Sequence, residues 1–322
     1  MGYALKQYKN GFIQRFDKDG IIPYFTISDF EGLNYKENKF TNSIGIEIAY
    51  FVYFYQNYQK DKYIIFCPGI GPGHTAYLRE IEKLAKNGYL VLTLDYTGCD
   101  KSGGETLLSV NEPTRDVHDL IELVKSGKDD FLAPFSSKEI IVIGHSLGGY
   151  TALNTINIHP DIKKAVIISG FIDVILEMKG LSHIPFSFLF SDIKRFEKKT
   201  NNEYAKIKNL KYLKNTNDDI LFIHSIDDQL VPYKTSTALI YKKNRKENLQ
   251  FLIVDNKSHN PNYTLDALKY IKETFGTLNK LSSDGTLKTL EDKQNFMKDK
   301  DIFKMTEQDE EVFSKILEFL NK

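Results

Sequence analysis

Tryptophan is absent from this chain of 322 residues, and cysteine, methionine and proline are scarce, with 2, 4 and 9 copies. Two cysteines provide no disulfide framework. Hydrophobic residues make up 41% of the chain and charged residues 27%, which is the composition of an ordinary globular protein. We interpret Cys67 and Cys99 as reduced thiols of a cytoplasmic protein, with a redox-sensitive pair as the alternative.

Neither sign of charge predominates, because 43 Lys and Arg balance 43 Asp and Glu. The balance gives no reason to expect binding to nucleic acid or to an anionic membrane surface. The N-terminus has no apolar signal segment. The best candidate for a membrane span, 171–190, is interrupted by Asp173, Glu177 and Lys179. We therefore expect no membrane span, and no pattern specifies an oligomeric state.

Short apolar strands alternate with helical patterns along the chain, which is typical of a mostly parallel sheet covered on both faces. The expected strands are 21–30, 44–55, 63–67, 89–94, 139–143, 165–169, 220–224 and 249–254, and the expected helices are 75–86, 111–125, 150–158, 234–243 and 307–320. The polar segment 34–43 is expected to form a turn, and Thr306 to cap the last helix.

Three segments do not fit this alternation. Residues 1–20 form an N-terminal extension, 171–215 are an insertion between two strands, and 276–304 are a polar insertion before the final helix. The expected core therefore comprises 21–170 and 216–322.

The stretch Val142–Gly149 is the most informative, because an apolar strand there meets Gly-x-Ser-x-Gly and a helical pattern follows. This context predicts a nucleophile elbow. Glycines at 144 and 148 permit a tight, strained turn that lifts the Ser146 hydroxyl clear of the sheet. The helix N-terminus that follows favours a developing oxyanion. The alternative is a glycine-rich helix start whose serine has no catalytic role.

A serine nucleophile needs a base to take its proton and a carboxylate to orient that base. Asp227 and Asp228 follow one predicted strand, and His259 lies in a loop beyond the last predicted strand. The order Ser, Asp, His is the one expected for hydrolases with this elbow. The other histidines have no metal-ligand spacing with each other or with the cysteines, so we expect no metal site.

Five motifs, taken in order, resemble those of the α/β-hydrolase superfamily and cover roughly residues 44–262 and the final helix. They are Pro68–Gly71, Asp95–Gly103, Gly144–Gly149, Asp228–Pro232 and Ser258–His259. The resemblance implies an α/β fold with a mostly parallel eight-stranded sheet, helices on both faces and a small cap insertion. It also implies Ser146 as the nucleophile, His259 as the base and Asp228 as the orienting acid, since the family spacing Asp-x-x-Val-Pro favours Asp228 over Asp227.

The family usually has His-Gly after its third strand, whereas this chain has Cys67-Pro68-Gly69. The oxyanion donors at this place are backbone amides, so the change is tolerable. Alignment with the family implies the amides of Ile70 and Leu147. The glycine-rich loop at 69–73 lacks the Gly-Lys-Ser/Thr ending of a phosphate loop, which argues against nucleotide binding.

Four further polar residues lie in or near these motifs. His74 could contact substrate or be a polar loop residue. Asp173 occupies the position that some lipase-like members use for the acid. We expect Asp95 to stabilise its loop through Ser102, and His145 to be a packed structural residue.

The segment after the sixth strand is commonly a cap in this superfamily. Phe171 and Phe186 could line an apolar acyl or aryl pocket there, or could simply pack the cap onto the body. Between 194 and 214, eight basic residues accompany two acidic ones. They could steer anionic substrates, or form a solvated helix face.

These features predict a serine hydrolase that cleaves small or medium carboxylic esters through an acyl-enzyme, without a cofactor. An amide or peptide hydrolase and an acyl thioesterase are the nearest alternatives, and the compact cap and the lack of a propeller domain argue against the first. The alternative of another class is a catalytically inactive hydrolase-fold binding protein.

Overall fold

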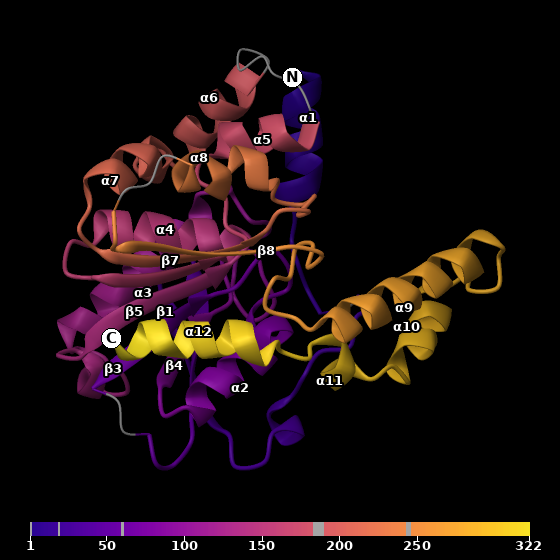
Figure 1. Cartoon of the computed structure of the whole chain (residues 1–322), viewed down its shortest axis with the longest axis horizontal. Helices are drawn as coiled ribbons and strands as arrows, with labels where there is room; N and C mark the ends of the chain where they lie inside the picture. Colours follow the sequence, from indigo (N-terminus) through magenta and orange to yellow (C-terminus); the bar gives the residue numbers. More distant parts are fainter. Residues whose placement is uncertain (1, 19, 59–60, 183–189, 243–245) are drawn as a thin grey trace.

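A computed structural model describes residues 2–18, 20–58, 61–182, 190–242 and 246–322 of the chain. Its centre is one sheet with the strand order β1-β2-β4-β3-β5-β6-β7-β8 (Figure 1). The strands are β1 (Asn34–Thr41), β2 (Glu47–Phe54), β3 (Lys62–Cys67), β4 (Leu90–Leu94), β5 (Glu139–His145), β6 (Lys164–Ile168), β7 (Asp219–Ser225) and β8 (Leu249–Val254). Strand β2 pairs antiparallel with β1 and β4, and all later pairings are parallel. The predicted α/β-hydrolase fold is confirmed.

Helices cover both faces of the sheet, because the parallel strands are apolar on both sides. Helices α3, α4 and α8 lie on one face, and α2 and α12 on the other (Figure 1). The bounds are α1 (Tyr3–Phe12), α2 (Leu78–Lys86), α3 (Glu112–Ser126), α4 (Leu147–Ile158), α5 (Val174–Ser182), α6 (Ser191–Thr200), α7 (Asn209–Asn215), α8 (Thr237–Tyr241), α9 (Leu265–Ser283), α10 (Leu290–Lys298), α11 (Ile302–Met305) and α12 (Glu310–Asn321). None of the helices within the described ranges is both long and apolar enough to cross a bilayer.

The expectation for the first two elements was wrong. Residues 21–30 form no strand in the structure, and a 3-10 turn at Ile27–Asp29 begins at a capping box between Thr26 and Asp29. The first strand is instead β1, in the segment expected to be a turn. Its residues are mostly exposed because it is an edge strand paired on one side only, so it lacks the apolar alternation that reveals a strand.

Two helix predictions also need correction. The final helix begins at Glu310, because the Asp309 side chain accepts hydrogen bonds from the amides of Glu311 and Val312, so Thr306 is not its cap. The predicted helix 234–243 is reduced to a 3-10 turn and the short α8. Cys67 and Cys99 are buried and form no disulfide.

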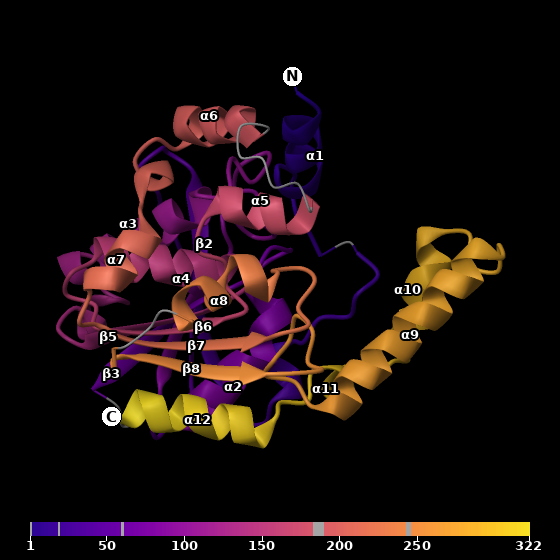
Figure 2. The ribbon, with the colours of Figure 1, turned by 45° about the horizontal axis from the view of Figure 1, so that its top comes forward.

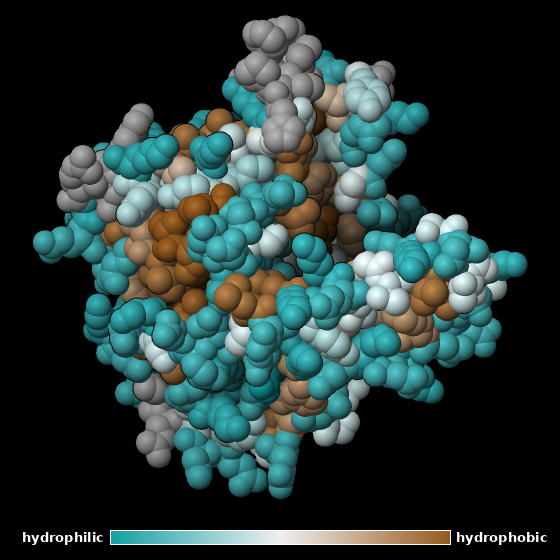
Figure 3. Space-filling model, turned by 45° about the vertical axis from the view of Figure 1, so that its right-hand side comes forward, coloured by the Kyte–Doolittle hydropathy of each residue, from teal (hydrophilic) through white to brown (hydrophobic). Residues whose placement is uncertain are grey.

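The segment 276–304 is helical rather than irregular. Helix α9 extends to Ser283, and α10 folds back against it to form an arm that projects from the body (Figures 1 and 2). A small core of Leu278, Met297 and Met305 holds the arm together. The sequence of the arm is polar because the arm projects from the body, so most of its surface faces solvent. Figure 3 shows that this surface is mostly hydrophilic.

Helix α1 and helices α5 and α6 of the segment 171–215 lie together above the sheet (Figure 2). We call residues 171–215 the cap segment. It contains α5, α6 and α7, and α1 packs against α6 through an edge-to-face contact of Tyr8 with Phe196. The Tyr8 hydroxyl also donates a hydrogen bond to the buried Glu197 carboxylate at 2.5 Å. The N-terminal extension therefore supports the cap segment.

Candidate active site

Ser146 lies between the end of β5 and the start of α4, with φ 57° and ψ −121°. Such a conformation is strained for a residue with a β-carbon. The turn closes only because both flanking glycines lack side chains. A β-carbon on Gly144 would lie 2.0 Å from the Gly148 carbonyl oxygen, and one on Gly148 would lie 1.9 Å from the Cys67 carbonyl oxygen. The local sequence thus produces a tight strand-to-helix turn with a half-buried serine at its tip.

His259 lies in the loop after β8, and its Nδ1 is 2.9 Å and 3.1 Å from the two carboxylate oxygens of Asp228 in the loop after β7. Because the carboxylate accepts, Nδ1 carries the proton and Nε2 is left as the acceptor. Asp227 does not make this contact. Its carboxylate accepts hydrogen bonds from the Ser225 hydroxyl and from the Ser258 amide at 3.1 Å, so it shapes the histidine loop.

The Asp228 carboxylate is fully buried and surrounded by donors. The amides of Leu230 and Val231 each donate to Oδ1 at 2.9 Å. Burial by itself would raise the pKa of Asp228, but hydrogen bonds from His224, His259 and Val231 hold that pKa well below its ordinary value. Asp228 therefore stays ionised while it orients His259.

His224 is a neighbour of the acid that the sequence analysis did not identify. Its Nε2 is 3.3 Å from Asp228 Oδ2 and 2.9 Å from the Val231 carbonyl oxygen, and its Nδ1 is 2.8 Å from the Thr237 hydroxyl. The side chain is completely buried. A histidine at a strand end, four residues before the acid, is the signal that could have indicated this contact.

A chain of hydrogen bonds also joins His259 to the loop after β3. The Tyr77 hydroxyl lies 3.0 Å from His145 Nδ1, and His145 Nε2 donates to the His259 carbonyl oxygen at 2.8 Å. The hydroxyl is in turn hydrogen-bonded to the backbone of Gly69. Burial and the neighbouring His259 lower the pKa of His145 to about 3, so it remains a neutral link.

These hydrogen bonds give His145 a function beyond packing, because His145 holds the backbone of His259, the candidate base. Gly69 must be glycine for the same reason, since a β-carbon there would lie 2.2 Å from the Tyr77 oxygen. The segments after β3 and β8 are thus tied to the end of β5, directly before Ser146.

The two implied oxyanion donors lie beside this network. Leu147 is the first residue of α4, so its amide has no intrahelical acceptor. Ile70 is half-buried in the loop directly after Gly69. Within the described part of the chain neither amide donates to a backbone carbonyl oxygen outside the regular elements, so the oxyanion roles that the resemblance implies stay a prediction.

Two other candidates are held by hydrogen bonds of their own. His74 is 2% exposed, its Nδ1 lies 2.8 Å from Asp95 and its Nε2 lies 2.8 Å from the Tyr53 hydroxyl. These contacts favour the interpretation of His74 as a polar loop residue held by Asp95, and a contact with substrate stays a prediction. Asp173 accepts hydrogen bonds from the amides of Ile175 and Leu176 at 2.9 Å and 3.1 Å, and so caps α5 instead of holding a histidine.

Of the two cap phenylalanines, Phe171 is 5% exposed and stacks on Tyr150 of α4 at a ring separation of 4.3 Å. It packs the cap segment onto the body. Phe186 lies outside the residues that the structure describes. A carboxyl of the cap segment, that of Glu177, is also buried, and burial together with the nearby Asp228 raises the pKa of Glu177 to about 8.

A cluster that could hold a metal lies elsewhere, where the fold brings together His118, Glu122 and His159. His159 Nε2 is 3.0 Å from His118 Nδ1, and the Lys125 ammonium is 3.3 Å from His159 Nδ1. The lysine can only donate, so the chain of bonds from Lys125 through His159 to His118 accounts for the cluster without an ion. The absence of a metal stays a prediction.

Comparison with known proteins identifies the family and the fold. The family model of the prolyl oligopeptidase family matches residues 75–277. No curated protein sequence matches significantly. Among solved structures, an esterase of Pyrococcus furiosus, Pf2001, is 22% identical, with a TM-score of 0.57 and coverage of 82% of this chain and 97% of that one.

An acylaminoacyl peptidase of Pyrococcus horikoshii is 19% identical, with a TM-score of 0.52, over 72% of this chain and 39% of its own. At these identities the structures establish a shared fold, and the sequence model establishes the family. The chain is a member of the prolyl oligopeptidase family, a hydrolase family of the α/β-hydrolase superfamily.

Proposed function

We propose that this protein is a serine hydrolase that cleaves carboxylic esters of small or medium size through an acyl-enzyme intermediate. The observation that carries the proposal is the pairing of His259 with the buried, ionised Asp228, at the same sheet edge as the strained turn of Ser146. A hydrogen-bonded carboxylate and histidine beside a half-buried serine in a tight turn is the arrangement of nucleophilic acyl transfer.

In the proposed mechanism, the Ser146 hydroxyl attacks the ester carbonyl while His259 Nε2 takes its proton. Asp228 holds the imidazole in the tautomer that leaves Nε2 free and stabilises the imidazolium. The amides of Ile70 and Leu147 donate to the oxyanion, where one such donor typically contributes about 10²–10³ in rate. His259 then protonates the leaving alcohol, and water repeats the sequence to release the acid. No cofactor takes part.

The central experiment is labelling with a fluorophosphonate probe followed by mass spectrometry of the adduct. We expect a single adduct on Ser146, lost in Ser146→Ala and strongly slowed in His259→Ala. Ester hydrolysis should fall by about 10⁴-fold or more in Ser146→Ala. Activity that survives this substitution would contradict the mechanism.

Peptide hydrolysis is the second candidate, because the similar fold of an acylaminoacyl peptidase favours it. Matched aryl esters and aminoacyl arylamides, offered in competition, separate the two activities. An acyl thioesterase is tested in the same way with acyl thioesters. No labelling in folded protein, together with no turnover of any of these substrates, would instead support the non-catalytic binding protein.

A further inference from the structure

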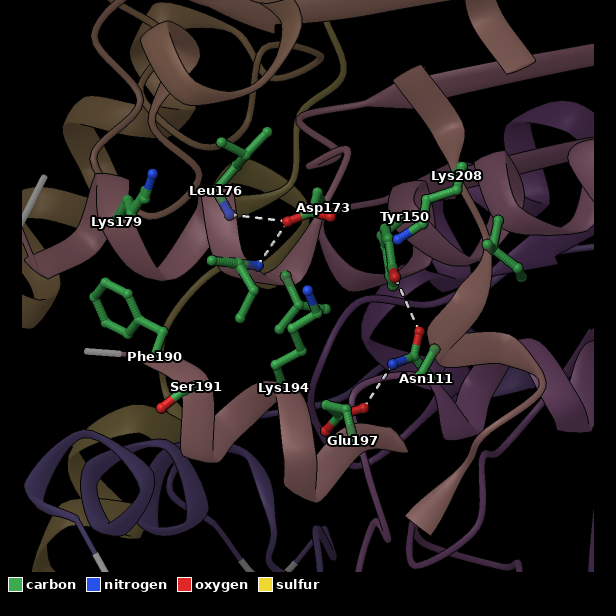
Figure 4. A pocket seen from close by; sticks show the side chains of 14 residues that line it. Asn111, Tyr150, Asp173, Leu176, Lys179, Phe190, Ser191, Lys194, Glu197 and Lys208 are labelled. Carbon is green, nitrogen blue, oxygen red and sulfur yellow. Dashed lines mark hydrogen bonds between the residues drawn. The ribbon is translucent and has the colours of Figure 1, made fainter. Parts of the chain in front are cut away.

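A cavity of about 530 Å³ is bordered by α5 and α6 of the cap segment, by Asn111 before α3 and by Tyr150 of α4 (Figure 4). Its inner wall includes Tyr150 and Asn111, which are joined by a hydrogen bond of 2.9 Å. The Tyr150 amide donates to the Ser146 carbonyl oxygen at 3.1 Å, so Tyr150 lies one helical turn after Ser146 along α4. Four residues of α-helix correspond to a rise of about 6 Å.

Three lysines from different parts of the cap segment border this cavity, namely Lys179 on α5, Lys194 on α6 and Lys208 just before α7. Figure 4 shows Lys194 and Lys208 reaching into the cavity from different sides, with Lys208 directed toward Tyr150, while Lys179 points away. Within the described ranges, no carboxylate lies within 4.0 Å of their ammonium groups, whereas the neighbouring Arg195 is paired with Asp192 at 3.0 Å.

The two acids of the cavity are engaged elsewhere. Asp173 is hydrogen-bonded to the first amides of α5. Glu197 accepts from Tyr8, from Asn111 at 2.6 Å and from the Val110 amide at 3.3 Å, and burial raises its pKa. Lys194 and Lys208 are exposed residues that reach into the cavity, and no carboxylate of the described residues is paired with either ammonium group. Positive charges that converge in a partly enclosed space favour an anion there.

We propose that Lys194 and Lys208 bind an anionic end group of the substrate, a carboxylate or a phosphate, while the scissile ester lies at Ser146. The proposal rests on the proposed esterase function. It defines the substrate class as esters whose acyl chain carries a negative charge at its far end. A charged hydrogen bond at this position discriminates against neutral esters of the same shape.

The test compares two p-nitrophenyl esters of equal shape, the adipate monoester and the 6-methylheptanoate, in which an isopropyl group replaces the carboxylate. We expect kcat/KM for the adipate monoester to be higher by about tenfold or more, and to fall to the level of the neutral ester in the Lys194→Gln/Lys208→Gln double variant. The 6-methylheptanoate should be hydrolysed equally well by both proteins. Added salt should raise KM for the charged ester only.

The matched control is Lys198→Gln/Lys206→Gln, which removes the same charge from α6 and from the turn before α7 but leaves the cavity lining intact. It should retain the preference for the charged ester. Equal rates for the two esters in the native protein would overturn the proposal, and so would an equal loss in both double variants.

Two further measurements separate this proposal from the proposed function. Fluorophosphonate labelling of Ser146 in every variant reports the nucleophile alone. Calorimetry with adipate and with pentyl phosphate reports the cavity alone and distinguishes a carboxylate from a phosphate site. One outcome is that no ester is hydrolysed, but either anion binds and this binding is lost in Lys194→Gln/Lys208→Gln. That outcome would support the anion site in the cavity and contradict the esterase function. If neither anion binds, the cavity proposal is wrong.

Discussion

The loops at the candidate triad and the cap segment above them treat buried polar groups in opposite ways. At the triad, Asp228 is ionised because four donors surround its carboxylate. In the cap segment, Glu177 is as deeply buried, yet its Oε2 has no hydrogen-bond partner among the described residues. Preorganised donors thus keep one carboxylate charged, and their absence drives the other toward its neutral form.

The contrast distinguishes the loops at the candidate triad, where donors are arranged around an ionised carboxylate, from the cap segment, where they are not. The loops at the candidate triad are joined by side-chain hydrogen bonds, so small changes there should alter the rate of hydrolysis. Changes in the cap segment should be felt in stability and in substrate choice.

The largest effect is expected at the ionised carboxylate. Asp228→Asn would keep the shape but would no longer fix the proton on His259 Nδ1, so kcat should fall by about 10⁴-fold. The adjacent Asp227→Asn is the control, because an amide oxygen can still accept from Ser258, and its loss should stay within about tenfold. A larger loss for Asp227→Asn than for Asp228→Asn would reverse the assignment of the acid.

A β-carbon added at the turn around Ser146 should disrupt the backbone that positions the candidate triad. Gly144→Ala would place that carbon 2.0 Å from the Gly148 carbonyl oxygen, so we expect several kcal/mol of destabilisation or no folded protein. Gly276→Ala in α9 meets nothing within 4 Å and should instead stabilise the chain by about 0.5–1 kcal/mol. Urea unfolding of both variants measures the difference, and a well-folded, active Gly144→Ala would contradict the elbow geometry.

A smaller effect is expected from loosening the hydrogen-bond chain behind His259. Tyr77→Phe removes the hydroxyl that joins Gly69 to His145, so kcat should fall by about tenfold with little change in the thermal midpoint. Steady-state kinetics and thermal unfolding, measured together, test this. Tyr55→Phe, which loses a hydroxyl bonded to Glu82 far from the site, should leave kcat unchanged.

The smallest effect on the rate is expected at the buried carboxyl of Glu177 in the cap segment, where a substitution should change stability instead. The pKa of Glu177 is raised from 4.5 to about 8, so between these values the folded chain retains a proton that the unfolded chain has lost. Stability should therefore fall as the pH rises through this window. The glutamine in Glu177→Gln cannot ionise. The thermal midpoint of the variant, relative to that of the native protein, should therefore rise progressively from pH 5 to pH 8. The exposed Glu203→Gln should show no such trend.

Most of the strand-and-helix pattern could be predicted, because buried parallel strands and amphipathic helices have strong local signals. The misassigned segments are those where tertiary pairing overrides the pattern. Strand β1 is polar because only its backbone is needed at the sheet edge. Residues 21–30 are aromatic because Phe25 and Phe30 pack against Phe303 of the arm, not because they form a strand.

The sequence by itself determined the elbow and the order of serine, acid and histidine, because a tight turn and the residues that follow strand ends are encoded within a few neighbouring positions. The family spacing already favoured Asp228 over Asp227, and the structure places Asp228 against His259. Only the tertiary structure decided that His224 and Tyr77 support the pair, and that Lys194 and Lys208 share a cavity with Tyr150. Most of these contacts join residues far apart in the chain. Their distances depend on how strands and helices pack, which no local pattern specifies.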